Sequence, residues 1–256
     1  MLSLLTTHAS GVRMGTFPYI EATAVCHRGL VRANNEDSIT VAGWVGDVEM
    51  TAPRRSRHEL KEPLLFAVAD GMGGHAGGEI ASRYAVKRLA AEQCSKEEDI
   101  ARLLAEINAE LYATMLADHS LLGMGTTVAG LILAGKRVVW FNVGDSRLYR
   151  CSEGALEQLS VDDVPPGPRS GLITQTLGGA PLLVPIAPHT GGQDLMLPSR
   201  FLLCSDGLTD MVADAEIERA LAGSDEDAVR ALFAAAMQAG GADNVSMIVV
   251  SARDSE

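Results

Sequence analysis

The sequence lacks closely spaced cysteines: Cys26, Cys94, Cys151 and Cys204 are far apart and form no CxxC pair. We therefore expect small buried thiols in a reducing compartment rather than a zinc site. No run approaches the roughly 20 apolar residues that span a membrane. The first residues also lack the basic start and sustained apolar core of a secretory signal. These absences predict a cytoplasmic protein without membrane insertion.

Basic residues are also few. The chain has 21 Lys and Arg against 33 Asp and Glu, a formal net charge of −12. Nucleic-acid binding needs clustered Lys and Arg, so this balance argues against a nucleic-acid partner. The acidic excess could be a solvated surface, or it could include Asp residues gathered to hold cations. Composition leaves both explanations open.

The length and composition suit one globular domain, since 47% of the 256 residues are hydrophobic and 21% are charged. Residues 1–18 show no periodicity and are expected to form a flexible tail. Residues 19–256 contain no internal repeat and no linker. We therefore expect them to form a single domain.

The first half of this domain mixes strand and helix patterns. The polar stretch 52–63 predicts an exposed loop. A helix is expected at about 78–93, and a second after Ser95, which with Glu98 forms a capping-box pattern. Apolar, β-branched runs predict three strands, at 21–27, 38–45 and 64–69.

The second half begins with three strand-like runs, 126–134, 136–143 and 146–151, whose short connections predict antiparallel neighbours. Hairpin-linked strands with two sequential helix pairs predict an α+β layered fold, in which antiparallel sheets face each other and helices cover their outer faces. The other expected elements are strands at 182–187, 200–205 and 244–252 and helices at 214–222 and 225–239.

Several carboxylates stand at the ends of these hydrophobic strands. Alone, each would be explained as a turn residue or helix cap. Together they predict a site for hard cations such as Mg²⁺ or Mn²⁺, because clustered carboxylates repel each other without a counter-charge. The carbonyl of Gly71, in DGMGG, could add a further ligand. The acidic residues are Glu36, Asp37, Asp70, Asp145, Asp206 and Asp243.

Arg32 lies four residues before Glu36 in VRANNEDS. Alone, an Arg near carboxylates is usually an ion-pair partner. Beside a metal site, its planar guanidinium becomes a credible phosphate clamp.

Six motifs occur in a characteristic order: RANNED, VADGMGG, MGTT, NVGDSR, CSDGL and DN. This set resembles the metal-dependent protein phosphatases, the type 2C Ser/Thr phosphatases in their short bacterial form. The similarity runs from about Thr23 to Val250. It implies a four-layer αββα sandwich of two mostly antiparallel sheets flanked by helix pairs, with metals in a cleft at one end.

The resemblance also assigns the main metal ligands. Asp70 would bridge two metal ions and Gly71 would contribute its carbonyl oxygen. Asp206 and Asp243 would bind the first metal. Asn244, next to Asp243, would orient its loop.

The remaining roles are assigned in the same way. Glu36 and Asp37 would hold metal-bound waters, and Asp145 with Asp206 would bind a third, weaker metal. Arg32 would bind the substrate phosphate. The resemblance thus implies two or three divalent cations, Mn²⁺ or Mg²⁺.

The implied activity is hydrolysis of phosphoserine and phosphothreonine on proteins by a metal-activated water, without a covalent phosphoenzyme. Its partners would be a bacterial Ser/Thr kinase and the substrates of that kinase, including regulators of protein secretion. Two alternatives stay open. The chain could be a regulatory phosphatase of anti-sigma-factor antagonists, or a catalytically inactive phosphoprotein-binding module.

The sequence departs from the family pattern in two places. Met72 stands where some members have a His, thought to protonate the leaving group. Asp163 replaces the His of a DHS-like motif that begins the flap, and the flap itself is shortened to about 160–172. The short flap predicts an open cleft that accepts a folded partner.

Overall fold

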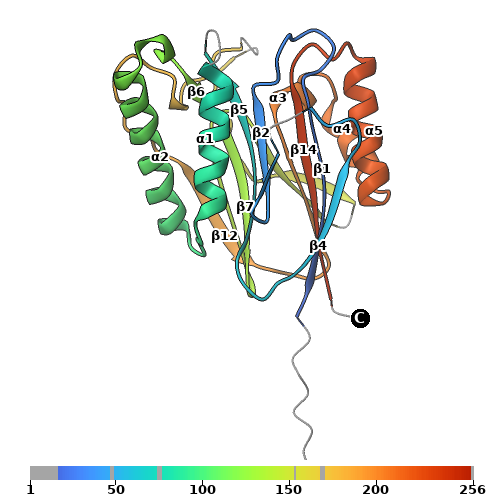
Figure 1. Cartoon of the computed structure of the whole chain (residues 1–256). Helices are drawn as coiled ribbons and strands as arrows, with labels where there is room; N and C mark the ends of the chain where they lie inside the picture. The colour runs from blue at the N-terminus through green and yellow to red at the C-terminus, as the bar shows by residue number, and fades with distance from the viewer. Residues whose placement is uncertain (1–16, 47–48, 74–76, 153, 168–170, 255–256) are drawn as a thin grey trace, which may run out of the picture.

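The computed structural model describes residues 17–46, 49–73, 77–152, 154–167 and 171–254. Two antiparallel sheets pack face to face, with helices on both outer faces (Figure 1). The predicted tail lies outside the described residues except for Phe17 and Pro18. The tail and the single-domain boundary therefore stay predictions.

Within the described residues, one sheet has six strands in the order β10-β9-β13-β14-β1-β4. The strands of this first sheet are β1 (Tyr19–His27), β4 (Arg54–Glu59), β9 (Arg147–Ser152), β10 (Ala155–Gln158), β13 (Ser199–Cys204) and β14 (Val245–Arg253).

The second sheet follows the order β11-β6-β5-β7-β8-β12, with β2 paired to β5 and β3 paired to β2. Its strands are β2 (Asp37–Val41), β3 (Trp44–Gly46), β5 (Leu64–Met72), β6 (Gly125–Thr126), β7 (Val128–Ala134), β8 (Arg137–Val143), β11 (Leu177–Gly178) and β12 (His189–Asp194).

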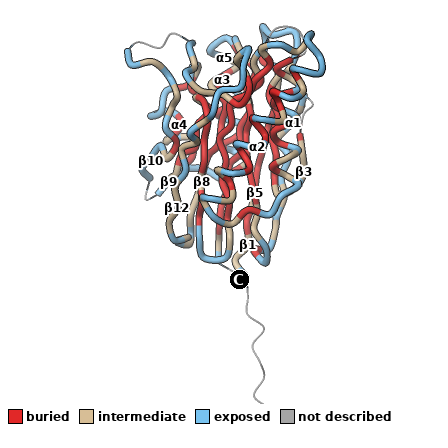
Figure 2. The backbone as a smooth tube through the Cα atoms, turned by 90° about the vertical axis from the view of Figure 1, so that its left-hand side faces the viewer, coloured by how far each residue is buried: buried red, intermediate tan, exposed pale blue. Residues whose placement is uncertain are grey.

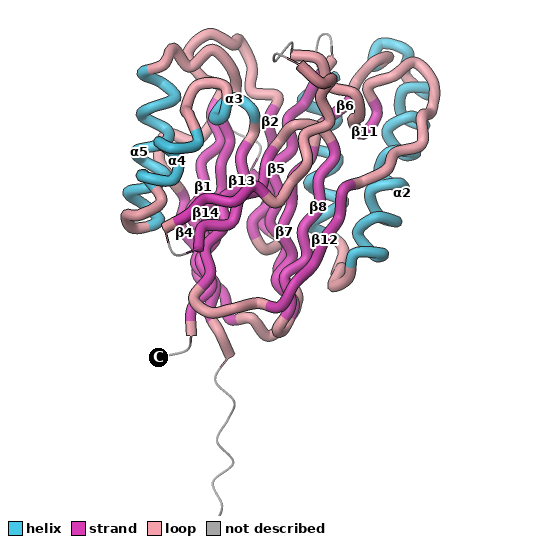
Figure 3. Tube along the Cα trace, turned by 180° about the vertical axis from the view of Figure 1, so that it is seen from behind, coloured by secondary structure: helices cyan, strands magenta, loops and turns pink. Residues whose placement is uncertain are grey.

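One helix pair covers each sheet, as Figures 1 and 3 show, so the predicted αββα sandwich is confirmed. None of the helices in the described residues has the length and apolar character of a membrane span. The second sheet carries α1 (Gly77–Ala91) and α2 (Glu97–Ala117), the first carries α4 (Asp214–Ala220) and α5 (Asp225–Gln238), and two short helices are η1 (His119–Leu121) and α3 (Asp206–Thr209).

Alternation along the central strands builds three apolar layers. In β5, Phe66 and Val68 face the other sheet, whereas Leu65 and Ala67 pack beneath α1 and α2. Most of β5 is buried (Figure 2), and because both of its faces are covered, its sequence is a continuous apolar run from Leu64 to Ala69. Each large side chain buried in this way stabilises the fold by about 1.5–3 kcal/mol.

Two predictions of where elements begin or end in the first half are wrong. The expected strand 38–45 is divided into β2 and β3 by a turn at Ala42 and Gly43, which have φ of 48° and 88°. The capping box does not form either. The N-cap of α2 is Lys96, which makes no side-chain capping hydrogen bond, so Ser95 lies one residue too early.

The predicted exposed loop 52–63 contains β4, which pairs with β1. Its polar composition hid this strand, because an edge strand can expose both faces to water. The predicted strand 182–187 is absent, and the strand in this region is β12, at 189–194. Prolines at 181, 185 and 188 explain the error, since proline cannot donate a hydrogen bond to a ladder.

The connection between β8 and β9 corrects a further expectation. The two strands are not antiparallel neighbours: β8 pairs with β7 and β12, and β9 pairs with β10 and β13. The turn at Gly144 and Asp145 therefore carries the chain from one sheet to the other. This crossing places Asp145 between the two sheets at one end of the sandwich.

Candidate active site

Loops and strand ends that are distant in sequence meet at one edge of the sandwich. Asp37 in β2 lies directly opposite Asp70 in β5 across the ladder between these strands. Asp206 begins α3, which only Ser205 separates from β13. Asp243 precedes β14 and contacts Arg32 from the β1–β2 loop. The predicted site residues therefore come together from both sheets.

Asp70 stands at the centre of the acidic group. Burial raises its pKa well above the usual range, and the nearby carboxylates of Asp37, Asp206 and Asp243 raise it further. A hydrogen bond between the carboxyl groups of Asp70 and Asp206 adds to the rise. The carbonyl oxygen of Asp70 accepts hydrogen bonds from the Thr126 hydroxyl and from the backbone N–H of Thr127. These bonds fix the end of β5.

Asp37 is 1% exposed. Burial raises its pKa to about 7 and the carboxylates of Asp206 and Asp243 add to the rise, although the hydrogen bond from Ser205 opposes it. The Ser205 hydroxyl donates to Asp37 Oδ2 at 2.8 Å and accepts from the backbone N–H of Ser246 at 3.0 Å. Ser205 thus joins β2 of one sheet to β13 and β14 of the other.

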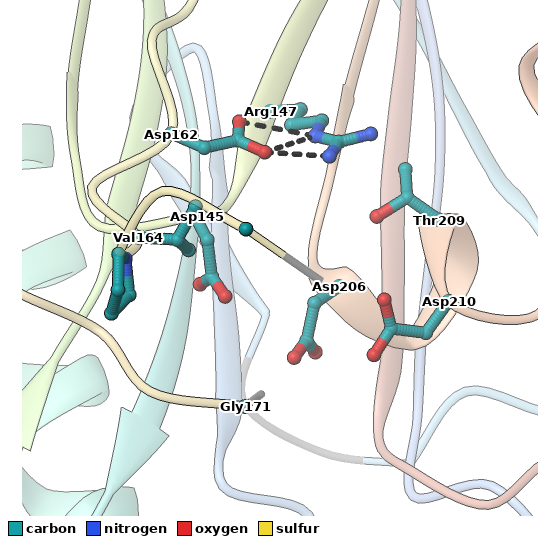
Figure 4. A pocket seen from close by; sticks show the side chains of 10 residues that line it. Asp145, Arg147, Asp162, Val164, Gly171, Asp206, Thr209 and Asp210 are labelled. Atoms are coloured by element: carbon teal, nitrogen blue, oxygen red, sulfur yellow. Dashed lines mark hydrogen bonds and ion pairs between the residues drawn. The ribbon is translucent and has the colours of Figure 1, made fainter. Parts of the chain in front are cut away.

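Asp145 and Asp206 face a small cavity of about 60 Å³ that Asp210 also lines (Figure 4). Burial raises the pKa of Asp145 to about 6, and the carboxylate of Asp206 contributes. Burial also raises the pKa of Asp206. At the far wall, Arg147 makes a two-pronged ion pair with Asp162, with contacts between 2.5 and 3.1 Å.

Glu36 contributes both its backbone and its side chain to the site. Its carbonyl oxygen accepts from the backbone N–H of Gly71 at 3.1 Å and from the Ser82 hydroxyl at 2.5 Å. Partial burial raises the pKa of the Glu36 carboxyl, whereas the Arg32 guanidinium lowers it. A Cβ atom added at Gly71 would lie 2.5 Å from this carbonyl oxygen and 2.2 Å from that of Gly78. Only glycine therefore fits here.

Arg32 is half-exposed and forms an ion pair with Asp243, with 2.6 Å between Nη2 and Oδ2. Partial burial lowers its pKa, but the Asp243 carboxylate and that of Asp70 raise it more, so the net direction is upward. The guanidinium thus lies at the mouth of the acidic group. It lies within reach of an incoming anion.

Asn244 holds the loop that carries Arg32. Its side-chain amide donates to the carbonyl oxygens of Arg28 and Asn34 at 3.0 and 2.9 Å, and its Oδ1 accepts from the backbone N–H of Glu36 at 2.8 Å. The sequence predicted that Asn244 orients the loop of Asp243, whereas these bonds hold the loop that carries Arg32. They also fix the loop at three points along its length.

The donor set fits hard cations. Asp37 Oδ1, Asp145 Oδ1 and Asp206 Oδ1 are buried and have no hydrogen-bond partner among the described residues. Such oxygens are costly unless a cation lies against them, and all-oxygen donors suit Mg²⁺ or Mn²⁺. In the described part of the chain, no three acidic, His or Cys side chains already enclose one point, and Asp243 is turned toward Arg32. The acidic residues therefore lie near one another, but their side chains are not yet arranged around a single cation position.

Comparison with known proteins identifies the family. The family model described as protein phosphatase 2C matches residues 55–248. The chain belongs to this family. PstP, a serine/threonine protein phosphatase of Mycobacterium tuberculosis, is 33% identical over 251 residues, which cover 89% of this chain and 44% of PstP. This chain therefore spans less than half the length of that relative.

Two other family members match over most of their length. The serine/threonine phosphatase stp of Listeria innocua is 31% identical, over 87% of this chain and 92% of stp. PppA, described as a key regulatory component of the T6SS in Pseudomonas aeruginosa, superposes with a TM-score of 0.76 at 29% identity, over 92% of this chain and 99% of PppA.

The catalytic domain of PstP has been solved in complex with two manganese ions. It superposes on this type 2C chain with a TM-score of 0.74 at 31% identity, over 92% of this chain and all of that domain.

Asp163, the departure at the start of the flap, has a structural role in this type 2C domain. Its Oδ2 accepts from the backbone N–H of Gly144 at 2.8 Å and from Gln175 Nε2 at 2.9 Å. Its Oδ1 lies 2.9 Å from His189 Nε2. Asp163 therefore ties the shortened flap to the turn that carries Asp145. Residues 168–170 of the predicted flap, 160–172, lie outside the described part of the chain.

Sequence reasoning missed several positioning residues. Ser205 lies inside the CSDGL motif, so its place beside Asp206 was a usable signal. Arg147 lies in NVGDSR, but nothing in the sequence indicated that Asp162 would pair with it. The sequence identified Asp163 only as the replacement of a His in the family motif, and its hydrogen bonds were not predicted.

The cysteines behave as expected for a chemistry that does not use them. Cys26, Cys94 and Cys204 are buried and Cys151 is half-buried, and none of the four forms a disulfide in the described part of the chain. Burial raises the pKa of Cys204 to about 12. Cys204 is therefore a poor nucleophile even though it lies two residues before Asp206.

Proposed function

We propose that this chain hydrolyses phosphoserine and phosphothreonine on proteins and needs two or three divalent cations, Mn²⁺ or Mg²⁺. The observation that carries the proposal is the group of buried carboxylates with unpartnered oxygens beside a half-exposed arginine. Family membership supports it, as does the manganese bound by the catalytic domain of PstP.

The proposed ligands come from both sheets. Asp70, Asp206 and Asp243 would hold the principal cations, and the Gly71 carbonyl oxygen would contribute from the end of β5. Asp145 would complete a further site with Asp206, and Glu36 and Asp37 would accept hydrogen bonds from bound water. When bound, the cations would supply positive charge that lowers the pKa of water and stabilises phosphoryl oxygens.

The chain's own groups would bind and orient the substrate. Arg32 would exchange part of its contact with Asp243 for two phosphate oxygens, a geometry that suits a planar guanidinium. Ser205 would keep Asp37 in a single orientation. The Met72 side chain has no ionisable proton to donate, so the leaving oxygen would take its proton from solvent within the site.

Protein partners are proposed on the same basis. The relatives are named as Ser/Thr protein phosphatases, and PppA is described as a secretion-system regulator. We propose a cytoplasmic enzyme that opposes a bacterial Ser/Thr kinase and acts on its substrates, with secretion-system regulators among them. An inactive phosphoprotein-binding module is the second candidate. The presence of Asp70, Asp206 and Asp243 argues against it, because an inactive module would not need metal-binding carboxylates.

The test is hydrolysis of an aryl phosphate and of a phosphothreonine peptide, with Mn²⁺ and with EDTA, by wild type and by Asp206→Ala. We expect activity only from the wild type with metal. The variant loses a carboxylate that would serve both the principal cations and the further site with Asp145. Failure of the wild type on both substrates would leave the chain as a binding module. An Asp206→Ala protein with full activity would refute the site.

A further inference from the structure

Strand β4 is a basic edge in an acidic protein. It forms the end of the six-stranded sheet and pairs only with β1 among the described strands, so its other side is open. Residues 54–61 include three arginines, a histidine and a lysine against one acidic residue, Glu59, which pairs with Lys61, whereas the whole chain has a net charge of −12. This surface, which we call the β4 edge, comprises residues 54–61.

Two of these arginines stack on aromatic rings. The Arg54 guanidinium lies 4.3 Å from the centre of the Trp44 ring, and that of Arg57 lies 3.8 Å from the Tyr19 ring. Among the described residues neither has a carboxylate partner, whereas Arg55 pairs with Glu226. Stacking on an aromatic ring restrains a guanidinium while leaving its N–H groups exposed. The β4 edge therefore presents two positioned guanidinium groups that form no ion pair among the described residues.

The two guanidinium groups frame the open edge. Arg54 is opposite Ala24, which faces the interior between the sheets, and Arg57 is opposite Glu21 on the other face. Residues three apart in a strand point to opposite faces. A strand added beside β4 would thus meet one arginine on each of its faces. Two carboxylates three residues apart would match them.

We propose that the β4 edge is a docking surface for an extended acidic segment of the phosphoprotein substrate, which adds to the sheet as a seventh strand. The proposal rests on the phosphatase function proposed above. Open backbone groups would supply hydrogen bonds, and the arginines would select acidic side chains. A nucleic acid would use the charge but not the strand edge. The same charges also keep β4 from pairing with unselected apolar strands.

The sheet fixes the direction of the docked segment. Every ladder between neighbouring strands of this sheet is antiparallel, so the added strand would run antiparallel to β4 and parallel to β1. It would leave the edge at Arg54, opposite Ala24, three residues before β1 ends at His27. The Arg54 end of the added strand would lie about 10 Å, measured along β1, from the loop that carries Arg32. The acidic segment therefore precedes the phosphorylated residue in the substrate.

The experiment compares phosphothreonine peptides that differ in one respect at a time. The first has an eight-residue Glu- and Val-containing segment, a five-residue Gly/Ser linker and then phosphothreonine. The second replaces Glu with Gln, and the third places the acidic segment after the phosphothreonine. We expect the wild type to show a kcat/KM about tenfold higher on the first peptide than on either control, the scale of two surface charge contacts. Added KCl should reduce this preference.

The variant R54E/R57E should lose the preference, and R54K/R57K should keep most of it because the charge remains. The matched control K87E/K136E makes the same charge change at exposed positions on α1 and the β7–β8 turn. It should retain the preference. All proteins should hydrolyse an aryl phosphate equally. If R54E/R57E does not fold, as judged by thermal melting, R54Q/R57Q replaces it.

Other outcomes would overturn the docking surface. These are a wild type without preference, a preference that survives R54E/R57E, equal use of the reversed peptide, or equal arginine-dependent binding of an oligothymidine. If the wild type fails even on the aryl phosphate, the proposed function fails instead. Fluorescence anisotropy of the labelled unphosphorylated acidic peptide still tests the docking surface in that case, and binding that matches the Gln peptide would reject it.

Discussion

The substitution Asp37→Asn should stabilise the metal-free protein at alkaline pH. Asp37 is buried opposite Asp70, and one of its oxygens has no partner. Burial raises its pKa to about 7, above the usual value of 3.8. The folded protein therefore holds a proton on Asp37 across a pH range in which the unfolded chain has lost it. Asparagine has a similar shape, accepts from the Ser205 hydroxyl and carries no charge.

The magnitude follows from the shift in pKa. About three pH units correspond to about 4 kcal/mol at 1.36 kcal/mol per unit. Because the pKa is raised by folding, this stability is present in full below about pH 4 and is lost as the pH rises through about 7. Relative to wild type, Asp37→Asn should gain up to about 4 kcal/mol at pH 8 but only about 1 kcal/mol at pH 4.5.

The assay is urea unfolding of EDTA-treated protein at pH 4.5 and pH 8, followed by circular dichroism. Asp254→Asn, at an exposed position, is the matched control and should show little difference at either pH. A pH dependence for Asp37→Asn parallel to that of wild type would refute the reasoning. We also expect the stabilised variant to be less active, since Asp37 belongs to the proposed cation site.

Two further predictions concern the loop at the mouth of the site. Arg32→Ala should raise KM about tenfold while lowering kcat less, because a ground-state phosphate contact is lost; steady-state kinetics equal to wild type on every substrate would exclude the clamp. Asn244→Ala removes three hydrogen bonds to the loop 28–36 and should cost about 1–3 kcal/mol in urea unfolding. The control Asn34→Ala changes an exposed side chain in the same loop, and equal loss in both variants would contradict the role of Asn244.

The fold class was readable from sequence because the central strands carry strong, continuous apolar runs. β5 and β14 are buried on both faces, and no other placement would remove so much apolar surface from water. The edge strand β4 could not be predicted from the sequence. β4 exposes most of its residues, so its side chains carry no burial pattern and its state depends on pairing with β1.

The positions of the acidic residues were also predictable, because each carboxylate ends a hydrophobic segment and the motifs follow a family order. The sequence did not predict how these residues are supported. The hydrogen bond from Ser205 to Asp37 spans 168 positions, and Asp163 holds Gly144 through a flap that departs from the family pattern.

By itself, the sequence determined the layers, the acidic residues and the family, since burial periodicity and motif order are properties of short segments. Only the tertiary structure decided that the turn after β8 crosses between sheets, that Asp243 pairs with Arg32, and that β4 is a basic open edge. The reason is physical: pairing, desolvation and charge coupling depend on distances between segments. Those distances exist only once both sheets are packed.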